Sequence, residues 1–207
     1  MSTAPFLDAG EDLLAPAIPQ APVWRLTVSQ YHQMLAAGIL HEGDPIELLE
    51  GWLVQQMTEN PPHRLATELV RVQLEAIVEN DWHVQSPHPV TTDDSEPEPD
   101  ASVVRGKRRD YKSRHPAAKD IGLMVEVADS SLELDRTTKQ RIYARAKIPV
   151  YWIVNLIDCQ VEVYTDPTGP GAQPEYRNCQ VFGQDDHVPL MLDGQEVGRI
   201  AVRELLP

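Results

Sequence analysis

Three charged residues stand in segments whose pattern predicts burial, and together they could hold a metal ion. Glu126 interrupts the apolar run IGLMVEVA, which has the composition of a strand covered on both faces. Lys139 follows on a segment with helical spacing, on the side of Ile142 and Tyr143. Asp100 opens the strand-like segment DASVV directly after a proline. Two carboxylates beside an ammonium suit Mg²⁺ or Mn²⁺, because these ions prefer oxygen ligands and keep bound water.

Such a site suits hydrolysis of a phosphodiester, in which the metal activates water and Lys139 orients the nucleophile or stabilises charge on the phosphate. Each residue also has a plainer interpretation. Glu126 pairs with a cation or ends its strand in solvent, Lys139 extends its amine along the helix into water, and Asp100 is one more solvated acid. Taken singly, the plainer interpretations are favoured. Packing of the helix back onto the Glu126 strand explains both buried charges together.

The segments that must position these residues alternate between helical and strand-like patterns. We predict a helix from Thr27 to Gly38, a hairpin around Glu50-Gly51, a helix from Pro61 to near Asn80, strands within 83–104 and at 121–128, a helix from Leu132 to Lys147, strands at 150–156 and 160–165, and short strand candidates near Gln180 and Ile200. Apolar positions of the helix from Pro61 repeat every three or four residues, at Leu65, Leu69, Val72 and Ala76. This order predicts an α/β (α+β) fold, a mixed β-sheet flanked by helices.

Length and composition indicate one domain of 24–207 behind a flexible N-terminal arm of 1–23, which holds four prolines. No apolar run approaches the roughly 18 to 20 residues that cross a bilayer, and the N-terminus lacks the basic and apolar regions of a signal peptide. We therefore expect a cytoplasmic protein without membrane contact. The two cysteines, Cys159 and Cys179, are expected to be reduced thiols.

Charge is distributed unevenly along the chain. The formal net charge of -14 counts against tight nonspecific binding to nucleic acid, because such binding depends on Lys and Arg. Six basic residues are nevertheless concentrated in one run, which comprises Arg105, Lys107, Arg108, Arg109, Lys112 and Arg114. A solvated loop and a phosphate-contacting loop are equally compatible with this run.

Longer segments of the chain resemble one known family. They are LTVSQYHQM, PIELLEGWLV, PPHRLATELV, EPEPDASVV, IGLMVEVADSS, and DRTTKQRIYARAKIPVYWIVN with QVEVY after it. Over roughly residues 26 to 165 they resemble the Uma-type endonuclease family of the PD-(D/E)XK restriction-endonuclease-like nucleases. The resemblance implies a restriction-endonuclease-like fold, Mg²⁺ or Mn²⁺ as cofactor, and DNA as substrate.

The resemblance also implies roles for individual residues. Asp100 would be the motif aspartate, Glu126 the motif acid and Glu47 an additional acid. Lys139 would be the motif lysine moved from the strand to the following helix. The usual lysine position, two residues after the acid, holds Ala128 here. The Uma-type family shows the same departure from the general superfamily motif.

Other positions near this motif either depart from the family pattern or match it. The chain has ADSS where the family commonly has Ser-Pro-Ser-Thr, and Asn155 where it commonly has Asp. His63 matches a family histidine that would contact phosphate or assist proton transfer; the alternative is a surface histidine at a helix N-terminus. Glu50 competes with Glu47 for the role of early acid, although a solvated turn position suits it better.

We therefore expect a metal-dependent endonuclease that cleaves DNA. Its site comprises Asp100, Glu126, Lys139 and Glu47, with His63, Arg105, Lys107 and Arg108 as possible phosphate contacts. A homodimer would suit cleavage of two antiparallel strands. Two alternatives stay open: a noncatalytic interaction module that retains the nuclease fold, and a nuclease acting on RNA or on branched or single-stranded DNA.

Overall fold

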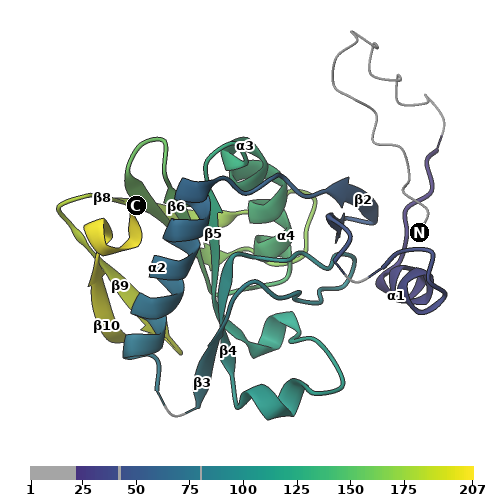
Figure 1. Ribbon diagram of the computed structural model, residues 1–207, viewed down its shortest axis with the longest axis horizontal. Coiled ribbons are helices and arrows are strands. Elements are labelled where there is room, and N and C mark those ends of the chain that lie inside the picture. The colour runs from purple at the N-terminus through teal and green to yellow at the C-terminus, as the bar shows by residue number, and fades with distance from the viewer. Residues whose placement is uncertain (1–21, 42, 80) are drawn as a thin grey trace, which may run out of the picture.

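The fold is organised around one mixed six-stranded sheet (Figure 1). The computed structural model describes residues 22–41, 43–79 and 81–207, so nearly all of the expected N-terminal arm lies outside the described residues. The strands of this sheet, in spatial order, are β3 (Trp82–Gln85), β4 (Ala101–Arg105), β5 (Ile121–Ala128), β6 (Val150–Asn155), β7 (Gln160–Pro167) and β8 (Tyr176–Gly183). Neighbouring strands are antiparallel except for β5 and β6, which are parallel.

The parallel pair requires a crossover, and the segment after β5 supplies it. The sequence predicted one helix from Leu132 to Lys147. The structure has α3 (Leu132–Leu134), a π-helical turn η3 (Asp135–Lys139) and α4 (Gln140–Arg145). The predicted helix is therefore present, but it is divided by a wider turn that ends on Lys139. Such π turns occur frequently at functional sites.

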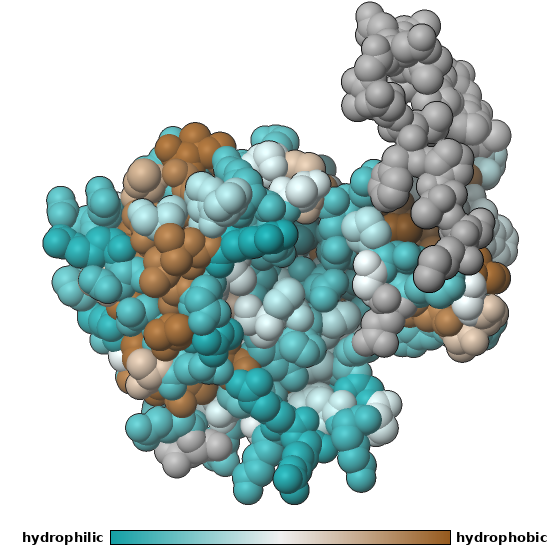
Figure 2. All heavy atoms as spheres, in the orientation of Figure 1, coloured by the Kyte–Doolittle hydropathy of each residue, from teal (hydrophilic) through white to brown (hydrophobic). Residues whose placement is uncertain are grey.

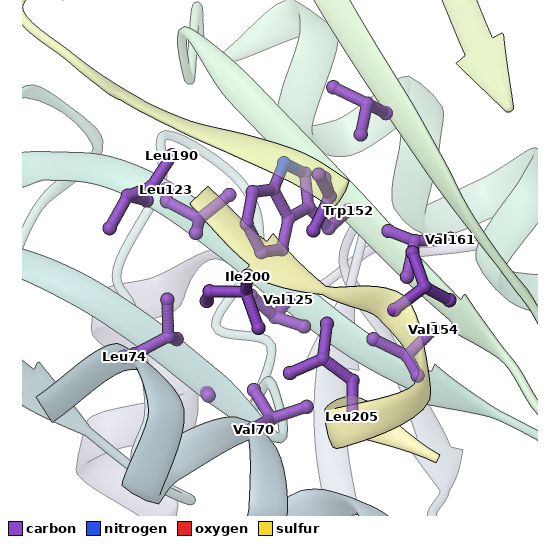
Figure 3. Close-up of a cluster of buried hydrophobic side chains, with 14 of the residues drawn as sticks. Val70, Leu74, Leu123, Val125, Trp152, Val154, Val161, Leu190, Ile200 and Leu205 are labelled. Atoms are coloured by element: carbon purple, nitrogen blue, oxygen red, sulfur yellow. The ribbon is translucent and has the colours of Figure 1, made fainter. Parts of the chain in front are cut away.

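Alternation along the central strands creates two separate cores, one on each face of the sheet. Leu123, Val125 and Val127 of β5 face the first core, whereas Met124 and Ala128 face the second. The first core is covered by α2 (Pro61–Ile77), the hairpin of β9 (His187–Leu192) and β10 (Gln195–Ala201), and η4 (Val202–Leu205). Figure 3 shows the indole of Trp152 lying among side chains from these elements. The second core is covered by α4.

The apolar stripe that the sequence indicates on α2 is not the face that packs on the sheet. The buried residues are Ala66, Val70 and Leu74, while Leu65 is 49% exposed and Val72 is 45% exposed. Figure 2 shows hydrophobic side chains in brown where α2 crosses the front of the molecule. The stripe of Ala66, Val70 and Leu74 is the one that packs into the first core.

The β1–β2 hairpin forms as predicted and lies apart from the large sheet. It joins β1 (Ile46–Leu49) to β2 (Trp52–Gln55), after the short helix α1 (Val28–Ala36). Glu50 and Gly51 occupy the turn with φ of 49° and 81°. Glycine is required at the second position, since a Cβ there would lie 2.6 Å from the Cβ of Arg25.

The remaining segments contain more regular secondary structure than the sequence predicted. The Gly/Pro-rich tail carries three full strands, β8, β9 and β10, because each is held by a long antiparallel register. The connection from β4 to β5 contains two short 3-10 turns, η1 (Arg108–Tyr111) and η2 (Ala118–Asp120). Among the described residues, no helix has the length and hydropathy needed to span a bilayer.

Candidate active site

A pocket of about 160 Å³ lies where the carboxyl end of β5 leads into α3. The four residues predicted to carry catalysis all line it: Asp100, Glu126, Lys139 and Glu47. They come from four segments that are distant in sequence. The fold therefore brings together the three residues named from their types and Glu47, which the resemblance implied.

Glu126 is the buried acid at the base of this pocket. It projects from β5 toward the α4 side and is 2% exposed. Its Oε1 accepts a hydrogen bond of 2.5 Å from the hydroxyl of Tyr143 and lies 3.1 Å from Lys139 Nζ. In the described part of the chain, its Oε2 accepts no hydrogen bond and is left for another ligand. Burial raises the pKa of Glu126 well above its usual value, although Lys139 opposes the shift.

Lys139 points inward, as the helical spacing predicted, and is 7% exposed. Its Nζ lies 3.6 Å from Glu47 Oε1, in addition to its contact with Glu126. Burial alone lowers the pKa of this amine, but the nearby carboxylates outweigh burial and the pKa is raised above 10.5. The amine is therefore protonated at neutral pH and acts as a fixed positive charge.

Asp135 is a member of this cluster that the sequence argument missed. It is 1% exposed, its Oδ2 accepts a hydrogen bond of 2.7 Å from Ser131 Oγ, and its Oδ1 lies 4.0 Å from Lys139 Nζ. Oδ1 makes no hydrogen bond within the described residues. Burial raises the pKa of Asp135 to about 6. The signal was its position four residues before Lys139, which puts both side chains on one helical face.

Asp100 is held at the rim of the pocket by backbone contacts. Its Oδ2 accepts a hydrogen bond of 2.8 Å from Val127 N, and Ser86 Oγ donates one of 2.6 Å to its carbonyl. Val127 directly follows Glu126 on β5. The hydrogen bond from Val127 N therefore fixes the position of Asp100 relative to Glu126. The plainer interpretation of Asp100, a solvated acid, does not hold because its side chain is only 13% exposed.

The structure also distinguishes the two candidates for the early acid. Glu47 is 4% exposed, lines the pocket, and its Oε2 accepts a hydrogen bond of 3.1 Å from Glu98 N. Glu50 instead faces α4, where its two oxygens lie 2.9 and 2.7 Å from the guanidinium of Arg141. Arg145 adds a third contact of 2.9 Å. The pocket therefore receives Glu47, as the resemblance implied.

His63 lies inside the site and not on the surface of the α2 N-terminus. Its side chain is 14% exposed, and its Nε2 lies 3.5 Å from Asp100 Oδ2. Its Nδ1 is buried without a hydrogen bond to any described residue. Burial lowers the pKa of His63, but the contact with Asp100 outweighs it and the pKa is raised above 6.5. Ligand atoms of Glu59, His63 and Asp100 lie within 4.8 Å of one another.

The three basic residues named as phosphate contacts lie outside this pocket, on or beyond the far end of β4. Arg105 pairs with Asp193, and Arg108 pairs with Glu75 at 3.0 Å. Lys107 makes no ion pair within the described residues. Their part in binding stays a prediction.

The donor set of the pocket fits a hard divalent cation. The acids that line it are Glu47, Glu59, Glu98, Asp100, Glu126 and Asp129. Among the described residues, the basic groups that line the pocket are the ammonium of Lys139 and the imidazole of His63. Carboxylate oxygens are the ligands that Mg²⁺ and Mn²⁺ prefer, and an excess of buried negative charge is costly without a cation.

The comparison with family models decides the classification. A model described as "Putative restriction endonuclease", Uma2, matches residues 28–202 and so includes every residue of the site described above. This chain is a member of the Uma2 family. The place two residues after the motif acid, Ala128, is buried in the second core, and Lys139 reaches the acid from the helix instead. Asn155, another departure, donates hydrogen bonds to Asp158 and Glu162 and is not among the residues that line the pocket.

A solved structure confirms the fold class expected of a Uma2 member. A "putative nuclease belonging to DUF820" from Anabaena variabilis ATCC 29413 matches with a TM-score of 0.62 and 16% sequence identity. The match covers 87% of this chain and 97% of that one. The fold is thus the mixed sheet flanked by helices that the sequence predicted. No curated protein matches the chain.

Proposed function

We propose that this chain is a metal-dependent endonuclease that hydrolyses phosphodiester bonds of DNA. The observation that carries the proposal is the contact of 3.1 Å between Lys139 and Glu126 inside a pocket also lined by Asp100. Membership of the Uma2 family supports nuclease chemistry. DNA as substrate and Mg²⁺ or Mn²⁺ as cofactor are the finer parts of the proposal.

Each side chain has a role that follows from its geometry. Asp100 and Glu126 are the acids that would hold the cation, and Glu47 supports it through its position beside Lys139. When bound, a divalent cation would polarise a phosphoryl oxygen and lower the pKa of a water molecule. Lys139 is protonated, so it stabilises negative charge on the phosphate and does not serve as a base.

His63 and Glu59 extend the donor set to one side of Asp100. A histidine nitrogen binds Mn²⁺ more readily than Mg²⁺, so these residues favour Mn²⁺ at this end of the pocket. A dimer of two such chains would allow both strands of a duplex to be cut, and we propose a homodimer on that ground.

One observation favours a second function. The formal net charge of -14 opposes the approach of any nucleic acid. The same charge is compatible with a noncatalytic domain that retains the nuclease fold and binds a protein partner. Retention of Asp100, Glu126 and Lys139 in one pocket argues for catalysis over this alternative.

The decisive experiment measures cleavage of plasmid, linear and single-stranded DNA, and of RNA, with Mg²⁺, Mn²⁺ or EDTA. We expect metal-dependent cutting of DNA that falls roughly a hundredfold or more in Asp100→Asn, Glu126→Gln and Lys139→Gln. Asp185→Asn is the matched control, because that aspartate side chain is 96% exposed and lies outside the pocket.

Activity that persists in Asp100→Asn at the wild-type level would contradict the proposal. Preferred cutting of RNA would correct the substrate and leave the site assignment intact. Binding of nucleic acid without cutting under any metal condition would favour the noncatalytic function.

A further inference from the structure

The densest run of positive charge in this acidic protein is the basic loop of residues 105–119. The chain has 18 basic and 32 acidic residues. Seven of the basic residues fall within the basic loop, which contains one acid, Asp110. They are Arg105, Lys107, Arg108, Arg109, Lys112, Arg114 and Lys119. The formal charge of this segment is therefore opposite in sign to that of the whole chain.

Part of this charge is neutralised by ion pairs and part is available. Arg114 pairs with Asp120 at 2.7 Å, and Arg105 and Arg108 have the acidic partners described above. Among the described residues, Lys107, Arg109, Lys112 and Lys119 form no ion pair. These four exposed cations are free to neutralise another anion.

The basic loop has a fixed shape. Tyr111 donates a hydrogen bond of 2.7 Å to the carbonyl of Arg105, and the guanidinium of Arg114 lies 4.9 Å from the centre of the Tyr111 ring. Asp110 accepts a hydrogen bond of 2.8 Å from Lys107 N. A cationic surface held in this way binds phosphates with less loss of conformational entropy than a flexible chain does.

The basic loop borders the catalytic pocket through the segment that follows β3. Pro87 lines the catalytic pocket, and the next residue, His88, lines a second cavity together with Arg108 and Arg114. A third cavity, beside α1, is lined by Lys112 and Arg114. Hydrophilic side chains cover the lower part of the molecule in Figure 2, where Figure 1 places the connection from β4 to β5. Pro87 and His88, which are adjacent in the chain, thus connect the catalytic pocket with a cavity on the basic loop.

We propose that the basic loop holds the backbone of duplex DNA beside the catalytic pocket, with Lys107, Arg109 and Lys112 as the phosphate contacts. The inference rests on the proposed nuclease function and adds the surface that orients its substrate. β4 runs from the pocket to the basic loop, and its strand rise separates Asp100 from Arg105 by about 16 Å. Phosphates along one DNA strand are about 3.4 Å apart along the axis, so a duplex that passes both the pocket and the basic loop spans several nucleotides between them.

This assignment differs from the expectation drawn from sequence, which besides His63 named the three basic residues Arg105, Lys107 and Arg108. Two of those three are engaged by Asp193 and Glu75. The net negative charge of the chain repels DNA, so an approach that places the basic loop on the duplex is favoured.

The test is binding of a labelled duplex of about 25 base pairs by fluorescence anisotropy, with Ca²⁺ and with EDTA, over a series of salt concentrations. The variant is Arg109→Gln with Lys112→Gln. The control is Arg25→Gln with Lys147→Gln, which removes the same two charges at positions without an ion pair among the described residues. We expect the Kd of the first variant to rise roughly tenfold or more, and the slope of log K against log salt to fall by about 2.

Cleavage by the same proteins separates the two proposals. The basic-loop variant should lose kcat/KM through KM and keep the wild-type kcat at saturating DNA. Equal Kd values for the variant and its control would overturn the inference, even if cleavage persists. The inference is also overturned if the wild type binds duplex RNA or an acidic protein in place of duplex DNA. DNA binding lost in the variant supports the inference even if no chain cleaves DNA.

Discussion

Lys139 serves as the shared counterion of several buried acids, and this shared role defines the site at the scale of single residues. Glu126, Glu47 and Asp135 all lie within 4.0 Å of its Nζ. An ammonium that neutralises several carboxylates cannot be removed without leaving buried charge uncompensated. The same residue therefore governs both the stability of the metal-free protein and its chemistry.

A first prediction concerns stability without metal. Lys139→Met should lower the free energy of unfolding by about 3 to 5 kcal/mol near neutral pH in EDTA, because buried carboxylates lose their cation. Burial raises the folded-state pKa of Glu126 and Asp135, so these acids cost most stability when ionised. The destabilisation by these ionised acids falls as the pH drops through their raised pKa values. The loss of unfolding free energy in Lys139→Met, relative to the wild type, should therefore shrink between about pH 8 and about pH 5.

Denaturant unfolding at several pH values measures this deficit. Lys119→Met is the control, since that lysine is exposed and has no ion pair among the described residues. A deficit that is small, or that grows as the pH falls, would show that Lys139 is not the counterion of the cluster.

At the scale of elements, the site depends on the docking of the β1–β2 hairpin against α4. Arg141 and Arg145 lie one turn apart on α4, and both bind Glu50 in the hairpin turn. Arg145 also reaches Asp94 at 3.0 Å. Because Glu47 lies on the strand before this turn, the ion pairs hold Glu47 near Lys139, which immediately precedes α4.

A second prediction tests this docking. The hydrogen bond from Arg141 lowers the pKa of Glu50 to about 2, from 4.5, despite partial burial. A lowered carboxyl pKa contributes stability that is present above 4.5 and is lost as the pH falls toward 2. Glu50→Gln should therefore cost about 1 to 2 kcal/mol near neutral pH, after allowance for solvent screening of the arginines.

The cost should disappear as the pH falls through that interval, in unfolding measurements on both proteins. Glu204→Gln is the matched control, because Glu204 is exposed and forms no ion pair within the described chain. A difference that is constant across this interval would contradict the role of the ionised Glu50.

At the scale of the whole molecule, a rigid sheet with a core on each face supports a pocket that is strongly acidic. Glu126 lies on the interior strand β5 and Asp100 directly precedes the interior strand β4, so the two acids cannot move apart to reduce their repulsion. With a formal net charge of -14, the chain adds further negative potential. A bound cation should therefore stabilise the whole fold.

A third prediction follows from that balance. Mg²⁺ or Mn²⁺ at about a hundred times its Kd should stabilise the protein by about 2.7 kcal/mol and raise the Tm by several degrees. Asp100→Asn should lose most of this shift, whereas the exposed Asp185→Asn should keep it. Thermal unfolding with NaCl at matched ionic strength distinguishes binding from screening. An equal shift with NaCl would argue against a specific cation site.

Much of the fold follows from local pattern. Alternation in β5 correctly placed Glu126 opposite Val125 and Val127, and helical spacing correctly turned Lys139 inward. These features are local because the geometry of a strand or a helix relates neighbouring side chains directly. The pairing of Lys139 with Glu126 followed from the short crossover between the two parallel strands.

What remained was decided by contacts between distant segments. α2 carries two apolar stripes, and only the shape of the sheet selects Ala66 and Val70 over Leu65 for burial. The choice of Glu47 over Glu50 depends on arginines more than 90 residues further along the chain. Sequence by itself thus determined the elements and their charged faces. Tertiary structure decided which faces meet, because packing and ion pairing depend on partners that no local pattern specifies.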